Sequence, residues 1–398
     1  MNATKHQENS SLDFFKQLDQ TIIVIFILLS TLGIVMVTSA SIGMAEKNIG
    51  NAFHYGERQL FRVLLGVGMI YIACKIPTKF WQQNSMLLML IALFLLTIVL
   101  IPGVGKTVNG STRWIDFGLF TIQVSEIARL LIIMYLGSYL TRRSGEVKTD
   151  TMGFIKPMII MGVASGLLLM EPDFGATTVL LITGLGLLFL GGVRFGQFTL
   201  FVLGTGSILV LMVMTSVYRM ERVTAFLNPW ADPFDSGFQL TQALIAIGSG
   251  GWTGVGLGGS VQKLFYLPEA HTDFLYAIIA EELGFIGSVI IIVLFVWFLL
   301  RCFSIAKQAQ LKGQHFGGFL VYGVALMVST QALINIGVNL GALPTKGLTL
   351  PLMSYGGNSI LMTSFAIGLV LRVWIEINQQ PKKTKRAIRK EPKVLNDE

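Results

Sequence analysis

The chain has 398 residues, of which 53% are hydrophobic and 13% are charged, and its mean hydropathy is +0.67. Soluble domains carry about 25% charged residues, so this composition excludes an ordinary soluble protein and indicates a membrane protein with several spans. The net charge is +8, but the basic residues lie in short loops and one tail rather than on one face with aromatic residues, so nucleic acid is not an expected partner.

Apolar stretches of about 20 residues predict the membrane helices. Ten stretches qualify, at 22–42, 60–75, 81–101, 122–141, 155–171, 174–193, 198–217, 274–300, 318–341 and 353–374. The sequence therefore predicts an all-α polytopic membrane protein with about ten transmembrane helices and one long extracytoplasmic loop.

The distribution of lysine and arginine predicts the orientation. These residues favour cytosolic loops, and most of them lie inside if the N-terminus is cytosolic. We expect a cytosolic tail at 1–20, a transmembrane domain at 21–376 and a basic cytosolic tail at 377–398 that contacts anionic lipid. The protein is then expected in the cytoplasmic (inner) membrane, with both termini in the cytosol.

The two cysteines and one glycine motif resemble ligand-binding sequences, but neither feature predicts a ligand site. Cys74 and Cys302 end two apolar runs on the expected cytosolic side, so we expect neither a disulfide nor a metal site from them. Gly254, Gly256 and Gly259 match a dinucleotide fingerprint by spacing, but no strand precedes them and no βαβ unit surrounds them. We therefore expect no organic cofactor.

The outer loop at 218–273 is far longer than the others. Loops beyond about 15 residues are usually functional or disordered. This one is rich in aromatic residues, such as Trp230, Phe234 and Trp252, which are costly to leave in water. The composition predicts a packed loop with a short helix near 237–248.

Ionisable residues inside membrane spans are expensive and indicate function. Glu126 and Arg129 are three residues apart in the fourth span, so they share a helix face and can pair. Two interpretations are open for this pair: an ion pair that fixes helix packing, or one wall of a polar cavity open to the outside.

The stretch LPEAHTDFLYAIIAEELG at 267–284 carries four carboxylates at the mouth of a span, on Glu269, Asp273, Glu281 and Glu282. A solvated helix entrance is one explanation, because acids are favoured in the first turn of a helix. This explanation fits Asp273 less well, because Pro268 and the surrounding aromatic residues would hold its side chain in a fixed, partly dry place. The charge-free run that follows places Glu281 and Glu282 at the outer interface, with Asp273 two turns higher.

Other charges and glycines gather on the same outer side. They are Glu171 and Asp173 in one turn, Arg219 and Arg222 after the seventh span, Lys346 between two prolines, and Gly356 and Gly357, where backbone could approach a ligand closely. Cations can hold phosphate, and a carboxylate can act as a base toward a hydroxyl. The pattern suits a substrate with a lipid tail in the membrane and an anionic, sugar-bearing head outside.

Five long motifs carry a family resemblance. They are VNGSTRWIDFG, EPDFGATT, YRMERVTAFLNPWADPFDSGFQLTQ, YLPEAHTDFLYAIIAEELG and LPTKGLTLPLMSYGGNS. Together they resemble the SEDS family from about residue 20 to 374, and within it the cell-division branch more than the elongation branch. The chain departs from the family at Arg129, where lysine is frequent, and at Asn358, where serine is common. Arginine loses its proton less readily than lysine, which makes a proton-shuttling role for Arg129 less favourable.

The resemblance implies ten membrane helices and a peptidoglycan glycosyltransferase that polymerises lipid II on the outer face of the cytoplasmic membrane. It implies a class B penicillin-binding transpeptidase (FtsI type) and other divisome membrane proteins as partners, and a location at the division septum. The family's essential aspartate, in a TDF motif, falls on Asp273. Its pair of a glutamate and a basic residue in the fourth helix falls on Glu126 and Arg129.

Our hypothesis is that Asp273 is the catalytic base, which takes the proton of the acceptor 4-hydroxyl in a single, inverting displacement of the lipid pyrophosphate. A divalent cation (Mg²⁺ or Mn²⁺), with Asp273 as a candidate ligand, or an arginine would neutralise the leaving group. Supporting acids are Asp173 and Glu281. The candidate substrate-binding residues are Glu126, Arg129, Arg113, Arg219, Arg222, Lys346, Ser354, Tyr355 and Gly356.

Three other functions remain as alternatives. A lipid II flippase would need polar residues along the whole path to the cytosol, whereas the intramembrane charges here lie in the outer half. A non-catalytic divisome scaffold that recruits the transpeptidase would not depend on Asp273. An ion-coupled transporter would need charges and broken helices near the midplane, which the sequence does not indicate.

Overall fold

The computed structural model describes residues 17–379 except 109, 119–120, 216–219, 221–223, 225, 236, 265 and 345–346. Most of both expected tails therefore lies outside the described residues. The helices are α2 (Gln20–Ile49), α3 (His54–Lys75), α4 (Thr78–Gln83), α5 (Ser85–Ile98), α6 (Val124–Arg142), α7 (Ser144–Thr149), α8 (Thr151–Met170), α9 (Phe174–Leu190), α10 (Phe195–Met214), α12 (Phe238–Gly250), α13 (Leu275–Leu311), α14 (His315–Asn339) and α15 (Gly357–Gln379).

Each of the ten predicted spans overlaps a helix, and the third overlaps the end of α4 and contains α5. Within the described residues, six helices are long and apolar enough to cross a membrane, namely α2, α6, α8, α13, α14 and α15, and the apolar parts of α5, α9 and α10 are shorter. Helix α3 begins at His54 and carries Glu57, Arg58 and Arg62 in its first half. The all-α membrane fold is confirmed, and α12 confirms the short helix expected near 237–248.

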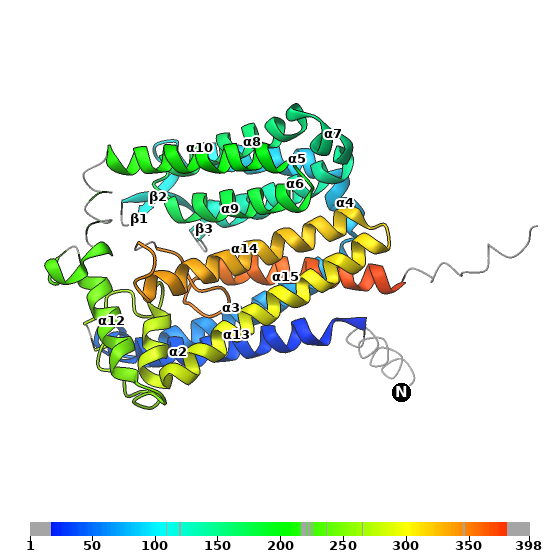
Figure 1. Cartoon of the computed structure of the whole chain (residues 1–398). Coiled ribbons are helices and arrows are strands. Elements are labelled where there is room, and N and C mark those ends of the chain that lie inside the picture. The colour runs from blue at the N-terminus through cyan, green and yellow to red at the C-terminus, as the bar shows by residue number, and fades with distance from the viewer. Residues whose placement is uncertain are drawn as a thin grey trace, which may run out of the picture.

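The helices form two groups that meet at α14 (Figure 1). Helices α5, α6, α8, α9 and α10 lie in one group, and α2, α3, α13 and α15 lie in the other; α14 contacts α6 and α9 on one side and α13 and α15 on the other. The start of α2 and the end of α15 share one end of the molecule, whereas α12 and the strands lie at the opposite end (Figure 1). We refer to this second end as the outer end.

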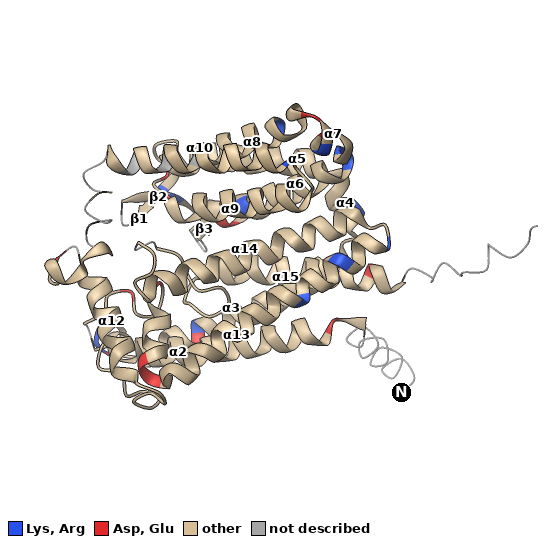
Figure 2. Cartoon of the chain, viewed as in Figure 1, with Lys and Arg blue, Asp and Glu red and all other residues tan. Residues whose placement is uncertain are grey.

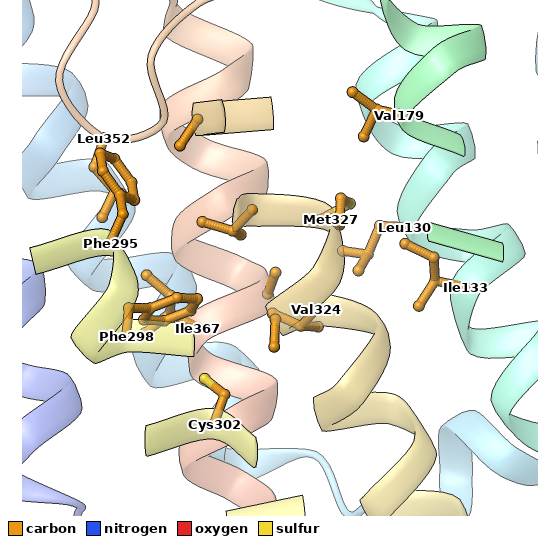
Figure 3. Packing of buried hydrophobic residues seen from close by; sticks show 14 of the residues in the cluster. Leu130, Ile133, Val179, Phe295, Phe298, Cys302, Val324, Met327, Leu352 and Ile367 are labelled. Atoms are coloured by element: carbon orange, nitrogen blue, oxygen red, sulfur yellow. The ribbon is translucent and has the colours of Figure 1, made fainter. Parts of the chain in front are cut away.

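The seam between the groups is filled by buried apolar side chains. Figure 3 shows Val324 and Met327 of α14 directed toward Leu130 and Ile133 of α6. On the other side of α14, Phe295 and Phe298 of α13 lie close to Leu352 and Ile367 (Figure 3). Without a strong hydrophobic drive between helices in lipid, such close packing holds membrane helices together. The seam therefore fixes the middle parts of α6, α13 and α14 relative to one another.

A small sheet caps the outer end, which the sequence analysis did not anticipate. Strands β1 (Gly105–Val108), β2 (Ser111–Asp116) and β3 (Thr121–Gln123) pair antiparallel in the order β1-β2-β3. The Asn358 side-chain amide donates to the carbonyl of Thr121 at 2.9 Å, which ties β3 to the start of α15. The sheet thereby holds Arg113, on β2, over the helix ends.

Helix α13 is broken at Gly284, which has φ 69° and ψ −165°. The carbonyls of Glu281 and Glu282 accept hydrogen bonds from the N–H groups of Val255 and Gly256, at 3.0 and 3.1 Å. After the break, the N–H groups of Phe285 and Ile286 donate to the carbonyls of two residues in the same loop, at 2.9 and 3.2 Å. The loop backbone thus supplies the partners that a continuous helix would have provided.

The predicted span at 274–300 is therefore not one continuous helix but is broken near its outer end. The break also explains the glycine motif. Gly254 has φ +81°, and a Cβ atom there would lie 2.1 Å from the carbonyl oxygen of Glu282. The glycine lets one backbone lie directly against another, which is a structural use of the motif.

We expect Gly254→Ala to destabilise the protein, because it combines a left-handed conformation with a clash against backbone. Gly258→Ala is the matched control, since Gly258 has φ +82° but nothing within 4 Å of the added Cβ. Thermal unfolding in detergent should show Gly254→Ala to be less stable than the control by about 1–3 kcal/mol. Equal losses in the two variants would contradict the backbone contact.

Candidate active site

Most of the helical surface carries no charge, and the lysines, arginines and acids are few along the spans (Figure 2). Against this background, one group of ionisable residues meets at the outer end. It comes from β2, from the start of α6, from the turn between α8 and α9, and from the turn before α13. Its members are Arg113, Glu126, Arg129, Glu171, Asp173, Glu269 and Asp273.

Asp273 lies in the turn that leads into α13, and its side chain is partly buried. Its carboxylate faces Gly347, where an added Cβ atom would come within 3.0 Å of Oδ2. In the same turn, the Thr272 hydroxyl donates to the Glu269 carboxylate at 2.7 Å. No ion pair to Asp273 exists among the described side chains. Within the described part of the chain, the carboxylate is therefore enclosed without a cation that neutralises it.

Burial raises the pKa of Asp273 to about 7. The negative charges of Glu269 and Asp173 contribute to this rise, and Arg113 opposes it. A carboxylate that titrates near neutral pH can both accept and release a proton under working conditions, as a general base must. The observed environment fits the role that the sequence analysis assigned to Asp273.

Asp173 and Arg113 form an ion pair beside it, with Arg113 Nη1 3.4 Å from Asp173 Oδ2. Ser125 Oγ donates to Asp173 Oδ2 at 3.0 Å, and the N–H of Ala176 donates to Oδ1 at 3.0 Å, which caps α9. The Nε atom of Arg113 is buried without a partner in the described structure. Asp173 is thus held in place, whereas the Nε–H group of Arg113 can still donate a hydrogen bond to a ligand.

Glu171, two residues before Asp173, is fully buried. Neither of its carboxylate oxygens has a hydrogen-bond partner within the described part of the chain. Burial, with the neighbouring charge of Asp173, raises the pKa of Glu171 to about 8 against the opposing effect of Arg113. Glu171 is therefore mostly a neutral acid at pH 7.

Glu126 and Arg129 form the ion pair that their spacing predicts, at 2.6 Å, with both side chains buried. Arg129 Nη1 also donates to Gln331 Oε1 at 3.1 Å, and Gln331 Nε2 donates to the carbonyl of Thr349 at 3.0 Å. The pair thus fixes packing between α6, α14 and the segment after 346. Ser125 connects it to the neighbouring pair, because its carbonyl accepts from Arg129 while its hydroxyl binds Asp173.

The predicted residues 354–356 lie beside the same turn. Ser354 is buried, and its hydroxyl accepts from the N–H of Leu350 at 2.9 Å, so it shapes the loop. The N–H of Tyr355 donates to the carbonyl of His271 at 2.9 Å, and Arg62 stacks on the Tyr355 ring at 4.1 Å. Gly356 directly precedes α15. These residues support the Asp273 turn from the side of α3 and α15.

Glu281 and Glu282 serve a different part of the structure. Glu281 accepts hydrogen bonds from Ser260 Oγ at 2.5 Å and from the N–H of Val261 at 3.0 Å. Glu282 pairs with Lys263 at 2.7 Å and accepts from Ser39 Oγ on α2. Both are buried, and they fasten the long outer loop to α2 and α13. Glu281 thus acts on the loop, away from the group around Asp273.

Three predicted phosphate contacts, Arg219, Arg222 and Lys346, lie outside the described residues. Several other polar residues of the site were not predicted from the sequence. A signal was available for three of them, because Gln331, Asn335 and Asn339 recur every four residues in an otherwise apolar span and so share one helix face. For Arg62, the signal was a charge inside a predicted span.

The described residues contain no group of three or more metal-ligating side chains. Mg²⁺ needs only one or two carboxylates when substrate phosphates supply the remaining ligands. The single enclosed carboxylate of Asp273 fits that mode of binding.

The fold and the site together define a class: a polytopic, mainly helical membrane protein with a group of acidic and basic residues at one end of its bundle. Residues 19–379 match the family model for the FtsW, RodA and SpoVE cell cycle proteins. The chain belongs to this family.

Similar proteins share most of their length with this chain. It is 57% identical to a probable peptidoglycan glycosyltransferase FtsW of Thioalkalivibrio sulfidiphilus over 86% of each chain. It is 51% identical to the Coxiella burnetii protein of the same name, over 90% of this chain and 96% of the relative.

Two solved structures share the fold. One belongs to a peptidoglycan synthase complex that coordinates polymerization and crosslinking, with a TM-score of 0.76 and 27% identity over 91% of this chain and 99% of the other. The second is the rod shape determining protein RodA of Thermus thermophilus, with a TM-score of 0.68 and 26% identity over 91% and 98% of the two chains.

Glu171 should make stability depend on pH. The raised pKa means that the folded protein holds a proton that the unfolded chain releases between about pH 4.5 and 8, so stability should fall as pH rises through this window. Glu171→Gln has nearly the same shape as the protonated acid but does not titrate. It should therefore remove the contribution of this residue to the decrease in stability with pH. Denaturation midpoints in detergent between pH 5 and 8.5 would measure it, and an unchanged slope would contradict a neutral Glu171.

Proposed function

We infer that this protein is a peptidoglycan glycosyltransferase that polymerises lipid II into glycan strands on the outer face of the cytoplasmic membrane during septal cell-wall synthesis. The observation that carries the mechanism is the enclosed carboxylate of Asp273 at the outer end of the bundle, which forms no ion pair with any described side chain. The shared name of the curated relatives supports the activity.

In the proposed reaction, Asp273 takes the proton of the acceptor sugar's 4-hydroxyl as that oxygen bonds to the donor's anomeric carbon. The bond from that carbon to the pyrophosphate breaks, and the lipid pyrophosphate leaves with the electron pair. A single displacement inverts the anomeric centre. The proton on Asp273 then passes to solvent, which a pKa near neutrality allows.

The other residues bind and orient the substrate. Arg113 has a free Nε donor for a phosphate oxygen, and Asp173 and Ser125 hold this arginine near Asp273. Glu126 and Arg129 order the wall behind it through Gln331. A divalent cation, Mg²⁺ or Mn²⁺, would neutralise charge on the pyrophosphate when bound, with Asp273 as its candidate protein ligand.

We propose a class B penicillin-binding transpeptidase as the partner, together with other divisome membrane proteins at the septum. The similarity to a chain of a peptidoglycan synthase complex supports this partnership. We also propose that both termini are cytosolic. The start of α2 and the end of α15 lie at the same end of the molecule, away from the site, which supports that orientation (Figure 1).

A lipid II flippase is the second candidate function. It would need polar residues along the path to the cytosolic side, whereas the group described here is confined to the outer end. Movement of labelled lipid II across proteoliposome membranes without strand formation would favour the flippase over the polymerase.

Asp273→Asn should greatly slow strand formation by the protein purified with its transpeptidase partner and supplied with lipid II and Mg²⁺. Loss of a general base costs about 10²- to 10⁴-fold in rate. Asp116→Asn, which changes an exposed acid on the sheet, is the control and should retain activity. If Asp273→Asn keeps the wild-type rate, the base lies elsewhere, and Glu126 becomes the next residue to test.

The polymerisation rate should rise as pH increases through about 7, because Asp273 must lose its proton to act. Glu269→Gln removes a negative charge that raises the pKa of Asp273, so it should move the rising limb to lower pH. Initial rates from pH 5.5 to 8.5 would measure both effects. A flat profile for the wild type would show that Asp273 does not act as the base.

A further inference from the structure

Two asparagines on α14 hold the backbone of the proposed base. Asn335 and Asn339 are 1% and 0% exposed, and they lie one helical turn apart. The Nδ2 atom of each donates to the carbonyl oxygen of Asp273, at 2.8 and 3.0 Å. One peptide carbonyl in the turn before α13 thus accepts from two buried amides, which is an unusual concentration of donors for a loop position.

Each amide makes a further contact that joins another segment to this carbonyl. Asn335 Nδ2 also donates to the carbonyl of Leu348 at 2.5 Å. Asn339 Oδ1 accepts from the N–H of Ala277 in the first turn of α13 at 3.0 Å, and its Nδ2 donates to the carbonyl of Asn335. The asparagines therefore connect α14, the entry to α13 and the loop that follows Lys346. We call Asn335 and Asn339 the asparagine clamp.

The clamp controls a close contact at the site. The carboxylate of Asp273 faces Gly347, and the neighbouring carbonyl, of Leu348, is bound to the same amide that binds the carbonyl of Asp273. Asn335 thereby sets the separation between the carboxylate and the opposite loop. A rotation of the Asp273 peptide would break two buried hydrogen bonds, each expensive to lose in a medium without water.

We propose that Asn335 and Asn339 are positioning residues for the glycosyltransferase, which hold the Asp273 carboxylate at a fixed place toward the acceptor hydroxyl. This inference rests on the proposed function. A group that only positions the base should affect the chemical step more than substrate binding. Misplacement of a reacting group by about 1 Å can cost on the order of 100-fold in rate.

The test compares Asn335→Leu and Asn335→Asp with wild type in the complex with the transpeptidase. Asn335→Asp keeps the side-chain shape but can donate at most one hydrogen bond, so it serves if Asn335→Leu fails to fold. Thr330→Val is the matched control, because it removes another buried polar group from the same helix. Rates at varied lipid II concentration would give kcat and KM for each variant.

We expect kcat to fall about 10- to 100-fold in both Asn335 variants, with KM within about twofold of wild type. In an Asp273→Asn background, the Asn335 change should add little further loss, because both changes act through the same group. An unchanged kcat, a loss confined to KM, or an equal loss in Thr330→Val would each overturn the proposal.

A second measurement does not depend on turnover. A water-soluble carbodiimide labels protonated carboxyls, and mass spectrometry can follow the Asp273 peptide as pH varies. A released carboxylate is better hydrated, so its labelling midpoint should move to lower pH in Asn335→Leu and in Asn335→Ser, neither of which adds a negative charge beside Asp273. If wild type forms no strands, the proposed function fails, yet this midpoint still decides on the clamp: an unchanged midpoint would overturn it.

Discussion

The cost of a buried charge organises the outer end of this protein. A carboxylate taken out of water must be paired, hydrogen-bonded or protonated. Glu126, Asp173 and Glu282 meet this condition by ion pairs with Arg129, Arg113 and Lys263. The pairs with Arg113 and Lys263 also join separate segments, and Gln331 links the Glu126–Arg129 pair to α14. The pairs therefore hold the sheet, the α8–α9 turn and the long loop against the helix ends.

Asp273 and Glu171 depart from this pattern, because the described structure pairs neither with a cation. Each carboxyl responds by holding its proton more tightly, and their pKa values rise to about 7 and 8. The two acids thus acquire different uses: the fully buried Glu171 completes the fold as a neutral group, whereas the partly buried Asp273 faces Gly347. Acids with a raised pKa are typical of active sites, where they accept and release protons.

The sequence predicted the elements well and their contacts poorly. Long apolar runs located the spans, and a spacing of three residues predicted the pair of Glu126 and Arg129, because both signals are local. The break at Gly284 depends on hydrogen bonds to a distant loop, and the amide of Asn335 reaches a carbonyl 62 residues away. Asp273 could be predicted from its motif, but the groups that hold it come from segments that only the tertiary structure brings together.

The repaired break in α13 has a consequence for biosynthesis. The loop around Gly254 leaves the ribosome about 30 residues before Gly284, which corresponds to a few seconds of translation. During that interval the N–H groups of Val255 and Gly256 lack the carbonyls that they bind in the finished protein. The long loop therefore cannot form these hydrogen bonds until the first turns of α13 have been synthesised. The site is then completed late, after most of the spans have been made.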